Sequence, residues 1–181
     1  MEELNFDVVV VGGGPAGSSA ARIAAENECT VALVEKEKEI AETVRTSGVT
    51  WISDIKKFKI PEDCYNSIKR FSFCSPKNSV TISDNVAKAA VLDVRKTYRF
   101  LANRGQSSGA KIFTSTNVSE VLKNSDGKCV GVIAKSKDKH IQFNAKVIID
   151  ASGFASVVAK ELGHVEQWKK FGVGAEFEVK T

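Results

Sequence analysis

The chain has 181 residues, of which 43% are hydrophobic and 27% charged, a balance typical of a soluble globular domain with its own core. The formal net charge is +4, and the lysines lie in short clusters, which favours a solvated basic surface and argues against a nucleic-acid-binding tract. No run of about 18 apolar residues exists, so no transmembrane helix is predicted.

The first 35 residues have the pattern of strand, turn, helix and strand. Residues 6–11 are apolar and β-branched almost without interruption, which is typical of a strand buried on both faces of a parallel sheet. A glycine turn over 12–17 leads into a small-residue helix over 16–25. Residues 30–34 predict a second buried strand. This order, within about 30 residues, has the size of a βαβ unit.

The middle of the chain predicts less regular structure. We expect a loop and a short helix over 40–60, ending before Pro61, and then two strands over 68–73 and 79–82 around a turn. A helix is predicted over 94–106 and a third core strand over 110–113.

The last third predicts an antiparallel meander inserted before a fourth core strand. The meander strands are expected over 118–122, 128–135 and 140–145, and the Asp126-Gly127 pair is a good turn signal between the first two. The core strand follows over 147–149, then a short helix over 154–162. A strand over 172–179 has no predicted partner, so we expect the chain to be the N-terminal part of a longer protein.

The glycine turn carries a G-x-G-x-x-G motif, Gly12-Gly13-Gly14-Pro15-Ala16-Gly17. Gly12 permits the tight turn, Gly14 leaves room for a pyrophosphate, and Gly17 allows close packing of helix and strand. The helix N-terminus, including Ser18, would face the phosphates. The surrounding strands make this a dinucleotide-binding prediction, whereas the motif alone is weak.

Glu35 lies 18 residues after Gly17, where its carboxylate can accept hydrogen bonds from an adenosine ribose. A 2′-phosphate would be repelled there, which disfavours NADP. The motif does not separate FAD from NAD, since both carry ADP. The antiparallel meander after the third core strand favours FAD, because it is typical of two-dinucleotide flavoprotein folds.

The order of these pieces resembles the N-terminal half of the geranylgeranyl reductase family, flavoproteins related to the p-hydroxybenzoate hydroxylase group. The matching stretches are residues 8–18, 34–36, 94–102 and 145–156, and their spacing fits over most of residues 5–165. The resemblance implies an FAD-dependent oxidoreductase that reduces double bonds of geranylgeranyl chains in isoprenoid lipid precursors. It also implies an α/β fold: a Rossmann-like FAD-binding domain whose parallel sheet carries helices and a three-stranded β-meander.

The resemblance further implies roles for individual residues. Arg95 would contact the phosphate or ribitol region, Arg45 would lie near the flavin or its ribose, and Val118 would offer backbone groups to the adenine. Without the family, both arginines would be interpreted as surface residues, because charged side chains usually stay solvated. The expected cofactor-binding residues are Gly12, Gly14, Pro15, Ala16, Gly17, Ser18, Glu35, Lys36, Arg45, Arg95, Val118, Ala151 and Gly153.

Three departures from the family pattern keep other functions open. Many geranylgeranyl reductases have a cysteine just after the arginine of the second-strand loop, whereas Arg45 is followed by Thr46. The hydroxylase relatives carry Asp-Gly in place of Ser152-Gly153, and the later Gly-Asp motif is absent. The alternatives are an FAD-dependent monooxygenase or halogenase, and a non-catalytic dinucleotide-binding module.

The remaining expectations concern organisation and surroundings. Residues 1–165 are expected to form the FAD-binding domain, with 66–90 the start of an inserted substrate-domain segment and 166–181 the start of a truncated substrate domain. The four cysteines form no C-x-x-C pair, which favours reduced thiols and a cytoplasmic protein. The substrate class implies a peripheral membrane contact and an external electron donor, NAD(P)H or ferredoxin. No metal site and no catalytic residue are predicted.

Overall fold

A computed structural model describes residues 1–137, 139–166, 170 and 172–174. The chain divides into two compact units. The first joins Met1–Thr43 to Tyr98–Val173, and the second is built on Val44–Thr97. The segment 66–90, predicted as an insertion, falls inside the second unit. Of the strand predicted over 172–179, all but residues 172–174 lie outside the described residues.

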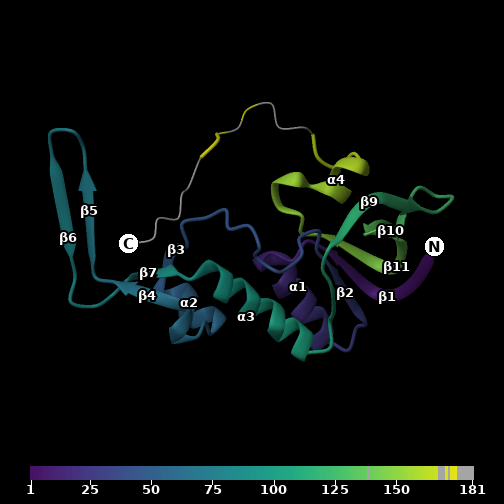
Figure 1. Cartoon of the computed structure of the whole chain (residues 1–181), viewed down its shortest axis with the longest axis horizontal. Coiled ribbons are helices and arrows are strands. Elements are labelled where there is room, and N and C mark those ends of the chain that lie inside the picture. Colours follow the sequence, from purple (N-terminus) through teal and green to yellow (C-terminus); the bar gives the residue numbers. More distant parts are fainter. Residues whose placement is uncertain (138, 167–169, 171, 175–181) are drawn as a thin grey trace. The chain divides into compact units, whose positions relative to one another are not determined.

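The first unit is built on one six-stranded sheet with the order β8-β2-β1-β11-β10-β9 (Figure 1). The first four strands in this order run parallel, and the β11–β10 and β10–β9 pairs are antiparallel. The α/β fold with a meander is therefore confirmed. The strands are β1 (Glu2–Val11), β2 (Val31–Val34), β8 (Lys111–Phe113), β9 (Thr116–Lys123), β10 (Cys129–Ser136) and β11 (Lys139–Asp150).

One prediction about this sheet is wrong. The strands expected over 140–145 and 147–149 are a single strand, β11, which pairs with β10 along its first half and with β1 along nearly its whole length. Lys146 lies between the two predicted strands, and its ammonium reaches the Asp7 carboxylate at 2.7 Å while the backbone stays extended. The last meander strand and the fourth core strand are therefore continuous.

Residues 8–11 of β1 are buried on both faces of the sheet, as predicted for this part of the chain. Val8 and Val10 face Ala21 of helix α1 (Pro15–Glu26), whereas Val9 and Val11 lie in a second cluster with Val158 of helix α4 (Val157–Glu161). Such burial on both faces is expected for a strand between parallel neighbours. The second cluster also holds three packed aromatic rings, those of Phe6, Phe113 and the fully buried Phe143.

The sheet curls so that its edge strand β9 returns to the end of β2. The Thr116 N–H donates to the Glu35 carbonyl at 2.9 Å, and the Ser115 N–H donates to the Glu37 carbonyl at 2.7 Å. These bonds hold the loop after β2 against the start of β9. Glu35, the acidic residue directly after β2, is therefore held by the first meander strand as well as by its connection to β2.

The second unit contains three short strands that were not predicted. They form an antiparallel sheet in the order β3-β7-β4. Their pairings join distant residues, such as Val49 with Val91 and Ile68 with Ala89, so short-range patterns do not show them. The strands are β3 (Val49–Trp51), β4 (Tyr65–Ile68) and β7 (Ala89–Leu92).

The predicted hairpin and helices are present. Strands β5 (Arg70–Cys74) and β6 (Ser79–Ser83) pair antiparallel as a two-stranded hairpin (Figure 1). The short helix α2 (Ile52–Phe58) lies in the segment 40–60 and ends before Pro61 as expected, and the longer α3 (Val94–Ser107) matches its predicted range of 94–106 closely. Within the described residues, no helix combines the length and apolarity needed to cross a bilayer.

Candidate dinucleotide-binding site

The glycine loop leaves β1 and enters α1 with backbone contacts that exclude side chains. Gly12 has φ +109°, a conformation that favours glycine, and its N–H donates to the Val34 carbonyl at 2.8 Å. A Cβ placed on Gly17 would lie 1.9 Å from the Gly12 carbonyl oxygen. The first turn of the helix therefore lies directly on the loop, as the motif predicts.

The start of α1 is open toward solvent and suited to an anion. Gly14 is the N-cap, so it offers no side chain to cap the helix, and the first turn holds no acidic residue. A Cβ on Gly14 would meet nothing within 4 Å, and both Pro15 and Ala16 are exposed. The free N–H groups and positive dipole end of the helix thus face an open space, which fits a pyrophosphate.

Glu35 is bound to the glycine loop. Its carboxylate accepts a hydrogen bond from the Gly13 N–H at 2.7 Å and a second from the Glu37 N–H at 2.8 Å. A carboxylate has about four lone-pair directions, so it can also accept bonds from ribose hydroxyls. This residue therefore supports the loop in addition to the ribose contact that the sequence predicts for it.

The side chains of Ser18 and Ile40 contact the glycine loop on its buried side. The Ser18 hydroxyl is fully buried and donates to the Gly13 carbonyl at 3.1 Å, which gives it a supporting role within the loop. A Cβ on Gly13 would lie 2.4 Å from the Ile40 side chain. Sequence reasoning passed over Gly13 and Ile40, although the run of three consecutive glycines was a signal that the middle one is also constrained.

The turn after β11 lies against the same loop. The Ala151 N–H donates to the Val11 carbonyl at 2.8 Å, and a Cβ on Gly12 would lie 2.4 Å from the Ala151 carbonyl oxygen. Gly153 is exposed, with φ +66° and open space where its side chain would be. The structure thus brings Ala151 beside Gly12. At Gly153, two residues further along, an added Cβ would meet no atom within 4 Å.

The remaining residues predicted to contact the cofactor lie outside the glycine loop and the turn after β11. Val118 is buried in the core of the first unit, on edge strand β9, and Lys36 is exposed just after Glu35. Arg45 and Arg95 are both exposed and belong to the second unit, whereas the glycine loop belongs to the first. Their contacts with the cofactor remain predictions.

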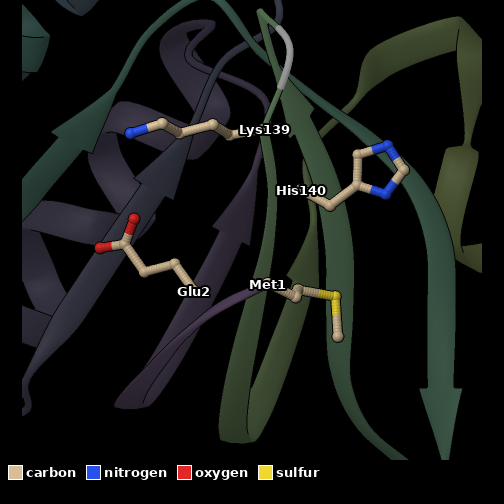
Figure 2. A pocket seen from close by; sticks show the side chains of 4 residues that line it. All are labelled: Met1, Glu2, Lys139 and His140. Atoms are coloured by element: carbon tan, nitrogen blue, oxygen red, sulfur yellow. The ribbon is translucent and has the colours of Figure 1, made fainter.

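A pocket at the other end of β1 is lined by Met1, Glu2, Lys139 and His140. Figure 2 shows the side chains of Glu2 and Lys139 on one side of the strands and those of Met1 and His140 on the other. At about 3.3 Å per residue, this end of β1 lies about 30 Å from the glycine loop. The pocket is therefore separate from the dinucleotide site.

Comparison with known families agrees with this geometry. The family model described as FAD dependent oxidoreductase matches residues 7–164, which includes the glycine loop, Glu35 and the turn after β11. The chain belongs to this family. The predictions of a flavoprotein and of FAD as the dinucleotide are thereby confirmed, and the open helix start fits the cofactor.

The chain also resembles individual curated proteins. It is 34% identical to a digeranylgeranylglycerophospholipid reductase of Methanocaldococcus jannaschii, over 90% of this chain and 42% of that protein. A protein encoded in the nifH2 5′ region of Methanosarcina barkeri is 32% identical over 89% of both chains. The chain thus spans less than half of the reductase but nearly all of the Methanosarcina protein.

Solved protein structures also resemble this chain. A geranylgeranyl bacteriochlorophyll reductase-like protein of Thermoplasma acidophilum matches with a TM-score of 0.80 and 27% identity, covering 89% of this chain and 42% of that one. The resemblance to the geranylgeranyl reductase family is thereby confirmed. The myxobacterial chondrochloren halogenase matches with a TM-score of 0.68 and 19% identity, which shows a shared fold and nothing more.

Proposed function

We propose that this chain is the FAD-binding part of a reductase that saturates double bonds of geranylgeranyl chains in isoprenoid lipid precursors. The observation that carries the substrate class is the 34% identity to a digeranylgeranylglycerophospholipid reductase over 90% of the chain. The glycine loop with its open helix start supports the cofactor half of the proposal. The likeness to halogenases is one of fold alone, so no observation favours a monooxygenase or halogenase.

In this proposal the chain's own residues bind and orient the cofactor. The first turn of α1 receives the pyrophosphate, because its N–H groups face open space beside Gly14. Glu35 binds the adenosine ribose while it fixes the Gly13 N–H. Bound flavin supplies the hydride-transfer chemistry, and the protein supplies position and electrostatics. Arg45 and Arg95 are proposed to bind the phosphate, ribitol or flavin regions.

An anaerobic assay tests the reductase activity. The whole protein of which this chain is proposed to be the FAD-binding part is loaded with FAD, chemically reduced and mixed with digeranylgeranylglycerophospholipid, and the return of the oxidised flavin spectrum is followed. We expect each reduced flavin to be reoxidised as it saturates a single double bond of a lipid chain, and mass spectrometry detects the partly saturated lipid. A fully saturated lipid is the matched control and should leave the flavin reduced.

The other outcomes separate the alternatives. FAD binding by the whole protein without lipid-dependent reoxidation would contradict the reductase proposal and favour a dinucleotide-binding module. In a parallel assay with oxygen admitted, reoxidation that yields an oxygenated or halogenated product would favour the monooxygenase or halogenase. The electron donor is proposed to be NAD(P)H or ferredoxin, and each can be tested as the reductant of bound FAD. Sedimentation with lipid vesicles tests the proposed peripheral membrane contact.

A further inference from the structure

Asp150, the last residue of β11, holds a dense set of hydrogen bonds beside the glycine loop. One carboxylate oxygen accepts bonds from the Ser152 N–H at 3.1 Å and the Ser152 hydroxyl at 2.6 Å. The other oxygen accepts bonds from the Val158 N–H at 2.9 Å and the Ala159 N–H at 2.8 Å. A single side chain thus binds the turn on both sides.

Ser152 extends this set. While it donates to Asp150, its hydroxyl oxygen accepts a bond from the Val157 N–H at 2.8 Å. Between these anchors, Ser156 adopts φ +45°, which is a strained conformation for a residue with a side chain. Strain of this kind persists only where the surrounding structure enforces it. The bonds to Asp150 and Ser152 provide that enforcement.

The turn held in this way is the one that lies against the glycine loop. The backbone of Ala151 and Ser152 comes so close to Gly12 that an added Cβ there would lie within 3.1 Å of both residues. Across the loop, a Cβ on Gly17 would lie 3.2 Å from the Ala151 Cβ. Because both segments are packed without space between them, a displaced turn would displace the loop as well.

We propose that Asp150 is a positioning residue for the pyrophosphate of the cofactor, acting through Ser152 and the backbone of the 151–156 turn. The inference rests on the proposed binding of FAD at the glycine loop. Four protein donors already surround the carboxylate, so it does not act as a ligand itself. It fixes the turn before the cofactor arrives, which lowers the ordering cost of binding the phosphates.

The test compares ligands that have a pyrophosphate with one that lacks it. Dissociation constants for FAD, ADP and adenosine are measured by calorimetry on the wild-type chain and on Asp150→Ala. We expect ADP and FAD to bind about tenfold more weakly in the variant. Adenosine should change less than about twofold, since Glu35 and the rest of its site are intact.

Further variants separate positioning from folding. Ser152→Ala removes the hydroxyl and should weaken ADP in the same direction, whereas Ser152→Thr keeps it and should restore wild-type affinity. Asp150→Asn serves if Asp150→Ala does not fold, because it opposes the Ser152 N–H with an amide donor at nearly equal size. Asp7→Asn is the matched control, since Asp7 accepts three bonds from Thr30 and Lys146 near the middle of β1 and β11, away from the turn and the glycine loop.

The outcomes are distinguishable. An unchanged ratio of ADP to adenosine affinity in the Asp150 and Ser152→Ala variants would overturn this inference, and so would an equal loss in Asp7→Asn. If the wild-type chain bound neither ADP nor FAD, the proposed function would fail and this inference with it. Loss of ADP affinity with retained adenosine binding, confined to the turn variants, is the supporting result.

Discussion

The Glu35 carboxylate accepts a 2.7 Å hydrogen bond from the N–H of Gly13, the middle glycine of the glycine loop. The end of the second strand is thereby joined to the turn that follows the first. This acid shapes the loop before any ligand is present, and we propose that it also binds the ribose afterwards. Variants of this residue should therefore affect the empty protein as well as the complex.

Glu35→Gln and Glu35→Ala test this double task. The glutamine keeps one acceptor but turns an amide donor toward one of the two N–H groups, and the alanine leaves the Gly13 N–H without its acceptor. A hydrogen bond to a charged group contributes about 1.5–3 kcal/mol, so ADP affinity should fall by about tenfold or more in both variants. Calorimetry measures the affinity, and thermal unfolding of the empty chain should show a lower Tm for Glu35→Ala. An unchanged Tm would contradict the role in the loop.

Gly14→Ala and Gly17→Ala should separate ligand binding from folding. A Cβ at Gly14 meets no protein atom, so the fold should lose only about 1 kcal/mol or less from the poorer N-cap. The same methyl group lies in the space proposed for the pyrophosphate, so FAD affinity should fall sharply. A Cβ at Gly17 meets the Gly12 carbonyl at 1.9 Å, and the fold should lose about 3 kcal/mol. Urea denaturation and FAD titration of both variants give the comparison, and equal stability losses would contradict it.

The acid stability of the chain should depend on Asp7. Hydrogen bonds from Lys146 and Thr30 hold the pKa of the Asp7 carboxyl well below its usual range. Because the folded pKa is lowered from an unfolded value of about 3.9, the contribution is complete above about pH 5 and is lost as the pH falls through 4 and below. The Tm difference between wild type and Asp7→Asn should therefore be largest near neutral pH and shrink toward pH 3. A difference that stays constant with pH would rule out this linkage.

Truncation of two phenylalanines should change stability by very different amounts. Phe143 is fully buried between Phe6 and Phe113, so Phe143→Ala should cost about 3–5 kcal/mol of unfolding free energy. Phe73, in the β5–β6 hairpin, is 61% exposed, and Phe73→Ala should change stability by about 0.5 kcal/mol or less. Urea denaturation of both variants tests the pair. A large loss for Phe73→Ala would mean that another surface covers the hairpin in solution.

The parts of the fold that the sequence predicted well are those set by local patterns. The nearly unbroken apolar run of β1, the glycine loop and the small-residue helix α1 form the βαβ unit within the first 35 residues, close to the predicted bounds except that β1 begins four residues earlier, at Glu2. The helix α3 and the β5–β6 hairpin are equally local. Each of these elements is specified by neighbours in the chain, so propensity, periodicity and turn residues were sufficient.

The parts that were missed depend on distant partners. Strands β3, β4 and β7 are three or four residues long and form only because each lies beside another, as Val49 does beside Val91. Strand β11 was divided at Lys146 because the sequence does not reveal that β1 would pair with it on both sides of that residue. Tertiary pairing overrides local preference in both cases.

The sequence predicted the residues of the glycine motif and Glu35, but not the hydrogen bonds and packing that hold the loop in place. Gly12, Gly14, Gly17 and Glu35 stand where the motif requires them, because their spacing follows from the βαβ unit. The bond from Gly13 to Glu35 and the turn around Asp150 arise from the packing of three separate segments. No spacing rule connects these segments, so only the structure reveals how the loop is held.

The continuous strand β11 has a consequence for how the chain folds during synthesis. Strand β1 leaves the ribosome first, and its β2 edge can pair early, but its other edge must wait for residues that lie 139 positions further along, as in the pairing of Glu2 with Ile141. Contacts between such distant residues slow folding, because a long loop must close before they form. Until then an open edge of valines can associate with other chains. Chaperone dependence of the nascent polypeptide should therefore end only once Asp150 has emerged.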